Sequence, residues 1–456
     1  MTDAMPAAMP AALELDDLPA LAGLRHVAVA YSGGRDSSVL LHMACWWAAR
    51  SGVQVHALHV QHGLSAHAAA WEAHCAAQVQ AWSDLCHVDL RVRRLALVVP
   101  PGASLEAHAR TARYQALAEM AREAGCDTVL LAHHRDDQVE TFLLQALRGA
   151  GPSGLSAMPG DIVRDGLRWV RPWLDRPRAE LEAHRVAHRL SHVEDDSNAD
   201  PRMARNRLRL KVLPALRSAF AQADEALLTS VRMAQDARVC LDALAQVDLS
   251  AVRDPDDPQA LSIARLAGLD PARRRNLLRR WLLDQGERAP GQSQLMRLST
   301  EPLQAPDGRW ATPGGVVHAY RARLRWVAQG DAVPRGAPIC RVPLQAGRYE
   351  VPEWLGSVVI ESADTGGIAL AGVDAVELRA RRGGEQFQSH TGGPPRSLKK
   401  QFQAAGVPPW ARQAPLLWRG DALVLVPGLG VDARARAPDG QAQWSLSWEP
   451  WPAAGR

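Results

Sequence analysis

Residues 27–38 read Val-Ala-Val-Ala-Tyr-Ser-Gly-Gly-Arg-Asp-Ser-Ser, and this stretch decides the fold of the first part of the chain. Residues 27–31 form an apolar run of strand composition, and a helical apolar pattern over 37–47 begins directly after Asp36. The stretch therefore predicts a strand, a tight glycine loop and a helix. Such a loop directs backbone amides toward one point at the positive end of the helix, where a phosphate or pyrophosphate binds favourably.

Asp36 is the unusual residue of this loop, because a carboxylate repels a bound phosphate. Its presence is explained if Mg²⁺ lies between the carboxylate and the phosphates. The two glycines permit positive φ and close approach of an anion, while Ser32, Ser37 and Ser38 can add hydroxyl donors. The Walker-A lysine is absent, which disfavours P-loop kinases and GTPases. The alternative is an ordinary strand-to-helix turn, in which Gly-Gly is common.

The length and composition favour a multidomain protein without a membrane anchor. The 456 residues suffice for about two to four domains. No run of about 18 apolar residues is present, and residues 1–24 lack the pattern of a signal peptide, so we expect a cytoplasmic protein. None of the six cysteines forms C-x-x-C, which predicts reduced, mostly buried thiols, and no zinc or iron–sulfur set is visible among them.

Basic residues gather in three places, although the net charge is only +4. Residues 202–217 contain six arginines and lysines and no acid, and two further clusters lie at 273–280 and 379–400. Three separated patches favour a polyanion larger than ATP, because each phosphate contact needs its own cation. The alternative for each patch is a solvated helix face in an arginine-rich chain.

Strand-like and helical stretches alternate through the first 132 residues. Beyond the opening stretch, strands are predicted at 53–60, 86–92 and 128–132, and helices at 66–82 and 104–124. This alternation predicts an α/β fold, a parallel sheet with helices on both faces, whose ligand crevice lies at the carboxyl ends of the strands. The glycine loop and His133-His134 both follow such strand ends and could face one site.

The later chain changes character. Residues 149–166 are rich in Gly, Pro and Ser and predict a mobile loop, and a helix is expected after Pro177. Residues 215–300 have a helical pattern, whereas 302–343 indicate a linker with short strands. From about residue 345 short apolar runs alternate with turns, which predicts a small α+β domain.

Two groups of residues could carry chemistry. Residues 133–141 read His-His-Arg-Asp-Asp-Gln-Val-Glu-Thr, and a helix from Asp136 would place Asp137 and Glu140 on one face. Acids in a first helical turn also compensate the helix dipole, and the zinc spacing H-E-x-x-H is missing. In the second group Arg110 and Arg113 lie three apart and could reach an ATP phosphate or an RNA backbone, although isolated arginines of this kind are commonly surface residues.

The order of several short motifs resembles that of the tRNA(Ile)-lysidine synthetases, within the pyrophosphate-loop ATPase superfamily. The motifs are S-G-G-R-D-S (32–37), H-V-Q-H-G-L-S (59–65), E-A-H-A-R-T-A-R-Y (106–114), A-H-H-R-D-D-Q-V-E-T (132–141), R-G-A-G (148–151), E-D-D-S-N (194–198), R-N-R-L-R (205–209), R-R-G-G-E (381–385), L-K-K-Q-F-Q (398–403) and V-P-P-W-A-R (407–412). The glycine loop alone identifies only the superfamily, whereas the ordered set is specific. The resemblance covers about residues 24–220 and resumes in the tail.

The resemblance implies a bacterial, Rossmann-like ligase that attaches lysine to C2 of cytidine 34 in the isoleucine tRNA with the anticodon CAU. ATP would adenylate the cytosine O2 with release of pyrophosphate, and the ε-amine of lysine would then expel AMP. The modified tRNA would accept isoleucine instead of methionine. The implied organisation is an extension over 1–23, a catalytic domain over 24–215, a mainly helical middle domain and linker over 216–345, and a tRNA-binding domain over 346–456.

The resemblance and the residue chemistry together suggest a role for each site residue. ATP is expected at Ser32, Gly33, Gly34, Arg35, Asp36 and Ser37, with Asp36 on Mg²⁺. Arg113 is expected to face the phosphates, and His133 to contact AMP or assist proton transfer. Asp137 and Glu140 are expected to hold the amine end of L-lysine. The tRNA contacts are expected from Arg205, Arg207, Lys399, Lys400 and Arg412.

Two other functions stay open at this point. Related pyrophosphate-loop enzymes thiolate tRNA, but they generally use C-x-x-C or paired catalytic cysteines, which this chain lacks. A non-catalytic tRNA-binding protein is the second alternative, and the acids Asp36, Asp137 and Glu140 speak against it because they repel RNA phosphates. A homodimer is one option for the assembly.

Overall fold

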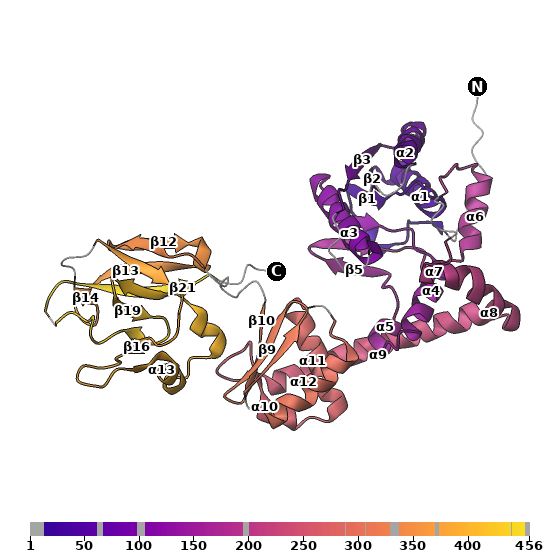
Figure 1. The fold of residues 1–456 in the computed structure, drawn as a ribbon. Helices are drawn as coiled ribbons and strands as arrows, with labels where there is room; N and C mark the ends of the chain where they lie inside the picture. The colour runs from indigo at the N-terminus through magenta and orange to yellow at the C-terminus, as the bar shows by residue number, and fades with distance from the viewer. Residues whose placement is uncertain are drawn as a thin grey trace. The chain divides into compact units, whose positions relative to one another are not determined.

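The computed structural model describes residues 13–61, 67–97, 105–194, 200–287, 289–305, 307–328, 337–369, 374–438 and 440–451, and the side chains of 105–107 lie outside the description. The chain forms two compact units, Met1–Cys240 and Leu241–Arg456 (Figure 1). Most of the motif at 59–65 and of the motif at 194–198 therefore lies outside the described residues.

A six-stranded sheet forms the centre of the first unit, in the order β3-β2-β1-β4-β6-β5. Its strands are β1 (His26–Ala30), β2 (Gln54–Gln61), β3 (Val88–Arg94), β4 (Thr128–Leu130), β5 (Asp161–Arg164) and β6 (Leu167–Val170). Neighbouring strands run parallel, except that β5 is antiparallel to β6. The predicted parallel sheet is confirmed, with one antiparallel strand at its edge.

Helices cover both faces of this sheet (Figure 1). One face packs against α1 (Arg35–Ser51), α2 (Ala68–Trp82) and α6 (Arg178–Ala187), and the other against α3 (Leu105–Glu123). Within β1, Val27 and Val29 belong to the first core and Ala28 to the second. Alternate strand residues point to opposite faces, so a strand that is buried on both sides must be apolar throughout, as this run is.

The strand order reverses direction at β1, which pairs with β2 on one side and with β4 on the other. In parallel sheets such a reversal opens a crevice at the carboxyl ends of the two central strands. The glycine loop follows β1 and His133-His134 follow β4, so the topology brings these two segments to one place. Helix α4 (Arg135–Ala146) begins directly after the histidines.

A helical segment begins after residue 203 and runs past Cys240, where the first unit ends. It contains α7 (Ala204–Arg207), a π-helical turn η4 (Leu208–Val212), α8 (Leu213–Ala219) and α9 (Ala223–Val252). Val139 of α4 packs in one cluster with Leu208 and Leu213. This apolar contact holds the basic segment against the helix that carries Asp137 and Glu140.

The prediction of a mobile loop at 149–166 is wrong. This segment contains the short helix α5 (Pro152–Leu155) and the edge strand β5, which pairs with β6 across a turn at Asp165-Gly166. Both turn residues have positive φ, 54° and 76°. The glycines and prolines punctuate a turn and a helix start here, and the pairing of β5 with a buried neighbour is a tertiary effect that local composition does not reveal.

The second unit contains a helical and antiparallel domain and then a β-rich domain. The helices α10 (Ile263–Ala267), α11 (Pro271–Asp284) and α12 (Gln292–Gln304) share a core with the sheet β7-β10-β9-β8. The strands are β7 (Leu261–Ser262), β8 (Gly308–Thr312), β9 (Gly315–Tyr320) and β10 (Arg323–Ala328). Strands β8 to β10 were expected in a linker, but Trp310, Val317 and Leu324 place them in this core.

The tail forms two antiparallel sheets around one core. The first, β11-β15-β18-β19-β20, uses residues Cys340–Pro343, Ala375–Arg379, Leu416–Arg419, Ala422–Val426 and Gly430–Val431. The second, β12-β13-β21-β14, uses Gly347–Val351, Gly356–Ala363, Gln443–Pro450 and Ile368–Ala369. The hairpin β16 (Gln386–Phe387) and β17 (Arg396–Ser397) joins α13 (Leu398–Ala404) in a smaller cluster. The predicted α+β tail is confirmed.

None of the described helices is long and apolar enough to cross a membrane.

Gly33 is the position of the glycine loop where a residue with a side chain would be strained. Its φ is +80°, and a Cβ placed there would lie 2.7 Å from the Cys75 sulfur of α2 and 3.2 Å from Val193. The loop is therefore seated directly on α2. Gly23 offers a comparison, because its φ is +73° and a Cβ there would meet nothing within 4 Å.

We predict that Gly33→Ala lowers the free energy of unfolding of the first unit by more than Gly23→Ala does. The backbone strain of each substitution is about 1–3 kcal/mol, and only Gly33→Ala adds the clash with Cys75 and Val193. Urea denaturation of both variants and the parent measures the difference. Equal losses would show that the loop moves off α2 without cost.

Candidate active site

The glycine loop presents the amino end of α1 without a side-chain cap. Gly34 is the N-cap residue, and no side chain among the described residues caps the helix start. The first amides of α1 are therefore left for a ligand, and the helix dipole favours an anion there. Arg35, at the start of α1, has its guanidinium 3.4 Å from Glu182.

The serine hydroxyls hold the loop in shape. Ser37 Oγ donates to the Gly34 carbonyl at 2.9 Å and accepts from the Ser32 backbone amide at 3.2 Å, and the two hydroxyl oxygens lie 3.0 Å apart. Ser38 Oγ donates to the Gly34 carbonyl at 3.0 Å and is buried. These bonds fix the turn, so the backbone amides are oriented before an anion arrives.

Asp36 lies in the first turn of α1 beside His134. Its Oδ2 is 3.6 Å from His134 Nε2, whereas its Oδ1 is buried and has no hydrogen-bond partner among the described residues. Burial alone would raise the pKa of Asp36, but His134, Arg178 and Arg35 hold it below the ordinary value. The side chain is therefore a carboxylate at neutral pH with one oxygen available to a cation.

His134 lies at the centre of three carboxylates. Its Nε2 is 3.4 Å from Asp137 and its Nδ1 is 3.6 Å from Asp136, in addition to the Asp36 contact. Burial would lower its pKa, but Asp36, Asp137 and Asp136 raise it above the ordinary value. As the N-cap of α4 it also donates its backbone amide to Asp137 at 3.1 Å. His134 thus connects the loop after β1 to the helix after β4.

Glu140 is buried, and its two oxygens accept from Arg209 at 2.7 and 3.0 Å. Arg205 lies 3.4 Å from the same carboxylate and donates to Thr141 at 2.8 Å. Arg209 also approaches Asp137 at 3.7 Å. Two acids of α4 and two arginines of the basic segment therefore form one network, and Arg207 on α7 is exposed beside it.

The other side of the site is positively charged. Arg113 of α3 is accessible to solvent yet surrounded by protein, which lowers its pKa, as do the nearby charges of Arg110 and Arg205. Burial lowers the pKa of His133, and Arg171, Arg110 and Arg205 add to this against the opposing effect of Asp137. His133 is consequently neutral at neutral pH, and its buried Nδ1 has no partner among the described residues. Such a group of cations with a neutral imidazole suits a phosphate ester.

Asp36, His133, Asp137 and Glu140 follow the carboxyl ends of β1 and β4 in the first unit. Arg113 lies on α3 of the same unit, where its charge interacts with that of Arg205. Sequence reasoning missed two members of this constellation, His134 and Arg209. His134 is adjacent to the predicted His133, and Arg209 ends the R-N-R-L-R motif, so both were visible. Their roles depend on which side of a turn each points to, and residue spacing does not give that.

The predicted tRNA residues of the tail lie in the second unit. Lys399 and Lys400 are exposed on α13. Arg412 donates to the Val407 carbonyl at 2.8 Å and lies over the rings of Tyr320 and Phe402. The lysines are therefore exposed cations, whereas Arg412 is held by its neighbours.

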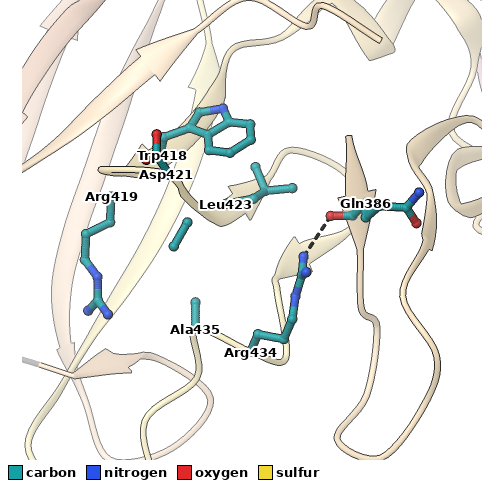
Figure 2. Close-up of a pocket in the computed structure, with 8 residues that line it drawn as sticks. Gln386, Trp418, Arg419, Asp421, Leu423, Arg434 and Ala435 are labelled. Atoms are coloured by element: carbon teal, nitrogen blue, oxygen red, sulfur yellow. Dashed lines mark hydrogen bonds between the residues drawn. The ribbon is translucent and has the colours of Figure 1, made fainter. Parts of the chain in front are cut away.

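A pocket of about 310 Å³ opens elsewhere in the tail (Figure 2). Trp418, Arg419 and Arg434 line it, and Arg434 is fixed by a 2.8 Å hydrogen bond to the Gln386 carbonyl and a 2.7 Å ion pair with Asp432. The lining thus combines an indole and two guanidinium groups with the carboxylate of Asp421.

Comparison with known proteins identifies families that match most of the chain. Three family models match, the PP-loop domain at residues 10–216, the TilS substrate binding domain at 261–325 and the TilS substrate C-terminal domain at 376–448. The tRNA(Ile)-lysidine synthase of Ralstonia nicotianae is 41% identical over 445 residues, which cover 94% of this chain and 93% of that protein.

Further relatives carry the same name. The tRNA(Ile)-lysidine synthase of Burkholderia pseudomallei is 39% identical, with 93% of both chains covered. That of Pectobacterium atrosepticum is 36% identical and covers 94% of this chain and 96% of its own length. The similarity therefore extends over the ATP-binding unit and both later domains. The chain belongs to the tRNA(Ile)-lysidine synthase family.

Proposed function

We propose that this protein uses ATP to attach L-lysine to C2 of cytidine 34 in an isoleucine tRNA with the anticodon CAU. The observation that carries the proposal is the set of charged groups that gathers beyond the ends of β1 and β4. An uncapped helix start and a cluster of arginines lie there together with three carboxylates, Asp36, Asp137 and Glu140. A site that binds ATP and a cationic amine needs both kinds of charge.

The ATP half of the site is assigned to the amino end of α1 and to Arg113. The amides of Gly33 to Ser37 suit the β and γ phosphates, and Arg113 suits the charge that develops at the α phosphate during adenylation. Asp36 fits a Mg²⁺ ion because its charged carboxylate keeps one buried oxygen without a partner among the described residues. When bound, Mg²⁺ supplies neutralisation of the phosphate charge next to this carboxylate.

Asp137 and Glu140 are assigned to the amine end of lysine. Arg209 donates to both Glu140 oxygens. We propose that an ammonium group of lysine replaces one of these two hydrogen bonds and pairs with the Glu140 carboxylate. The ε-amine attacks only when neutral, and a carboxylate beside it can accept its proton. His133, a neutral imidazole with an available nitrogen, is assigned to the AMP moiety.

Arg205 and Arg207 are assigned to the tRNA near the reacting nucleotide, and Lys399, Lys400 and Arg412 to tRNA contacts of the tail. Arg205 links Glu140 and Thr141, which places an RNA-binding candidate directly on the lysine-binding helix. Phosphates and backbone shape dominate recognition of double-stranded RNA, so exposed cations suffice for such contacts. A homodimer is the proposed assembly.

The buried cysteines Cys75 and Cys126 do not support tRNA thiolation. Cys45, Cys75 and Cys126 are buried. Burial raises the pKa of Cys75 to about 12 and that of Cys126 to about 12, so both remain thiols at neutral pH. Sulfur transfer needs a thiolate nucleophile.

Incubation of the protein with ATP, labelled lysine and a CAU-anticodon isoleucine tRNA transcript should transfer label to the tRNA. Transfer should require ATP and should be abolished when cytidine 34 is replaced by uridine, because the adenylated oxygen would then belong to a different base. A filter-binding assay of labelled tRNA measures it. Equal labelling of the uridine transcript, or uptake of sulfur from cysteine instead of lysine, would refute the proposed reaction.

The two half-reactions should separate by mutation. Asp36→Asn should slow pyrophosphate release by about 100-fold or more, because the residue assigned to hold Mg²⁺ loses its negative charge and the phosphates are no longer neutralised. Glu140→Gln should leave pyrophosphate release near the parent rate and raise the KM for lysine about 10- to 100-fold, the effect of one charge-assisted hydrogen bond.

Asp161→Asn is the matched control for Glu140→Gln, since it removes a carboxylate that also accepts from both nitrogens of an arginine, Arg168, in the exposed β5–β6 hairpin. It should change neither rate. Pyrophosphate release and lysine incorporation are measured on the same preparations. Equal loss of both steps in Glu140→Gln would contradict the division of roles between Asp36 and Glu140.

A further inference from the structure

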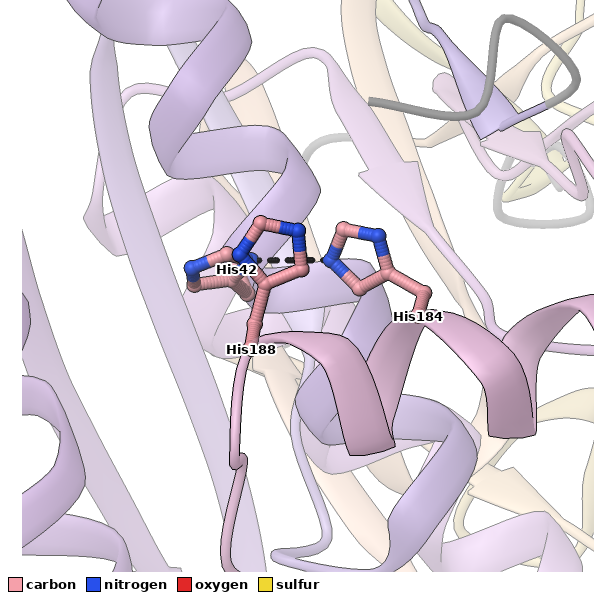
Figure 3. Close-up of side chains that lie close together, drawn as sticks. All are labelled: His42, His184 and His188. Atoms are coloured by element: carbon pink, nitrogen blue, oxygen red, sulfur yellow. Dashed lines mark hydrogen bonds between the residues drawn. The ribbon is translucent and has the colours of Figure 1, made fainter. Parts of the chain in front are cut away.

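Three histidines gather at the seam between α1 and α6, at a point that the proposed reaction does not use (Figure 3). His42 belongs to α1, His184 lies in the last turn of α6, and His188 is the C-cap residue of α6. His184 and His188 are four residues apart, so the helix presents them on one face. Figure 3 shows their rings facing His42 from the neighbouring helix.

The ring nitrogens are close enough to share one ion. One nitrogen from each ring lies within 4.8 Å of the others, and His42 Nδ1 is 3.0 Å from His184 Nε2. His42 and His184 are buried and His188 is half-buried. Three imidazoles leave one side of such a site open to solvent at His188, as zinc sites with three protein ligands do.

All three rings are neutral at neutral pH. Burial and the two other histidines lower the pKa of His42 to about 3, and burial and His188 lower that of His184 to about 4. Burial also lowers the pKa of His188. Neutral imidazole is the form that binds a metal, so these side chains need not lose a proton to solvent first.

The cluster does not satisfy its own hydrogen bonds. Trp46 Nε1 donates to His42 Nε2 at 3.2 Å, so the His42 proton lies on Nδ1 and points to His184 Nε2. His184 Nδ1 then carries a proton, and this buried nitrogen has no hydrogen-bond partner among the described residues. A buried donor without a partner lowers the stability of the fold, and apolar side chains would fill the space between the two helices without that loss.

We propose that His42, His184 and His188 form a zinc-binding site that clamps α1 to α6. Imidazole nitrogens favour Zn²⁺ over Mg²⁺ or Ca²⁺, which take oxygen ligands. Binding through His42 Nδ1 moves the ring proton to Nε2, where the Trp46 N–H opposes it. Trp46 therefore disfavours the metal-bound tautomer and must turn away when zinc binds.

The position of the clamp gives it a consequence for the active site. Helix α1 begins at Arg35 and Asp36, and α6 begins at Arg178, whose amide donates to Asp136 at 3.1 Å. His42 and His184 each lie six residues further along, or roughly 9 Å along the helix axis. A metal that joins the two helices there fixes the spacing of their amino ends. The end of α1 carries Asp36, and the end of α6 donates to Asp136 of α4; both carboxylates contact His134.

The test measures zinc bound by the full-length protein after removal of loosely bound ions. The parent should retain one more equivalent of Zn²⁺ than His188→Gln, and its thermal midpoint should rise with zinc more than that of the variant, because a ligand that binds only the folded state stabilises it. His87→Gln removes an exposed histidine of the same unit and should behave as the parent. The half-buried position of His188 makes His188→Gln the variant of choice for a folded protein, and its circular dichroism without zinc should match the parent.

Two further readouts are specific to coordination. Co²⁺ should give the visible absorption of a site with nitrogen ligands in the parent and not in His188→Gln. The affinity for Zn²⁺ should fall by more than about tenfold in His188→Gln, because even outer-shell changes cost that much, and should rise in Trp46→Phe, which removes the opposing donor. Equal zinc content in the parent and His188→Gln would refute the site, and so would binding that His87→Gln reduces equally.

Discussion

The contact of His134 with Asp36 and Asp137 is the interaction on which the active site depends. It joins the loop after β1 to the helix after β4, two segments about one hundred residues apart that the sheet only brings near each other. The carboxylates raise the pKa of His134 above its ordinary value, and His134 in turn lowers the pKa of Asp36. Each group therefore stabilises the charged form of the other, and neither would be tolerated alone in this environment.

The remaining charges are arranged around this contact by sign. The acids lie on the starts of α1 and α4, whereas the cations come from α3 and from the segment after residue 203. The Arg209–Glu140 pair is the place where the two groups meet, and the π-helical turn that contains Arg209 is held there by Leu208 packing on Val139. Apolar packing thus decides which arginine reaches the buried carboxylate. Acidic and basic side chains therefore approach the site from different elements and meet at this pair.

Much of the catalytic unit was predictable because its signals are local. The strand β1, the glycine loop and α1 follow from periodicity and turn chemistry within one short stretch. The acids of 133–141 can be recognised because several of them lie within nine residues. What could not be predicted depends on contacts between distant residues. The strand β5 exists because β6 offers it an edge, and β8 to β10 fold because α11 and α12 cover them. His134 rather than His133 contacts Asp36 because His134 is the N-cap residue of α4. The sequence pattern identifies which residues could act in the site, whereas tertiary packing decides where their side chains point.

Packing also explains why α1 can serve two purposes. Its first turn must remain uncapped and polar to receive an anion, which removes the stabilisation that a cap usually gives a helix start. The loss is offset further along the helix, where eleven of its residues are buried between the sheet and neighbouring helices, and where His42 meets the histidines of α6. Because a helix moves as a rigid rod over a few turns, whatever secures its middle also positions its open end. Contacts remote from the nucleotide, in the seam between α1 and α6, therefore belong to the same mechanical unit as Asp36.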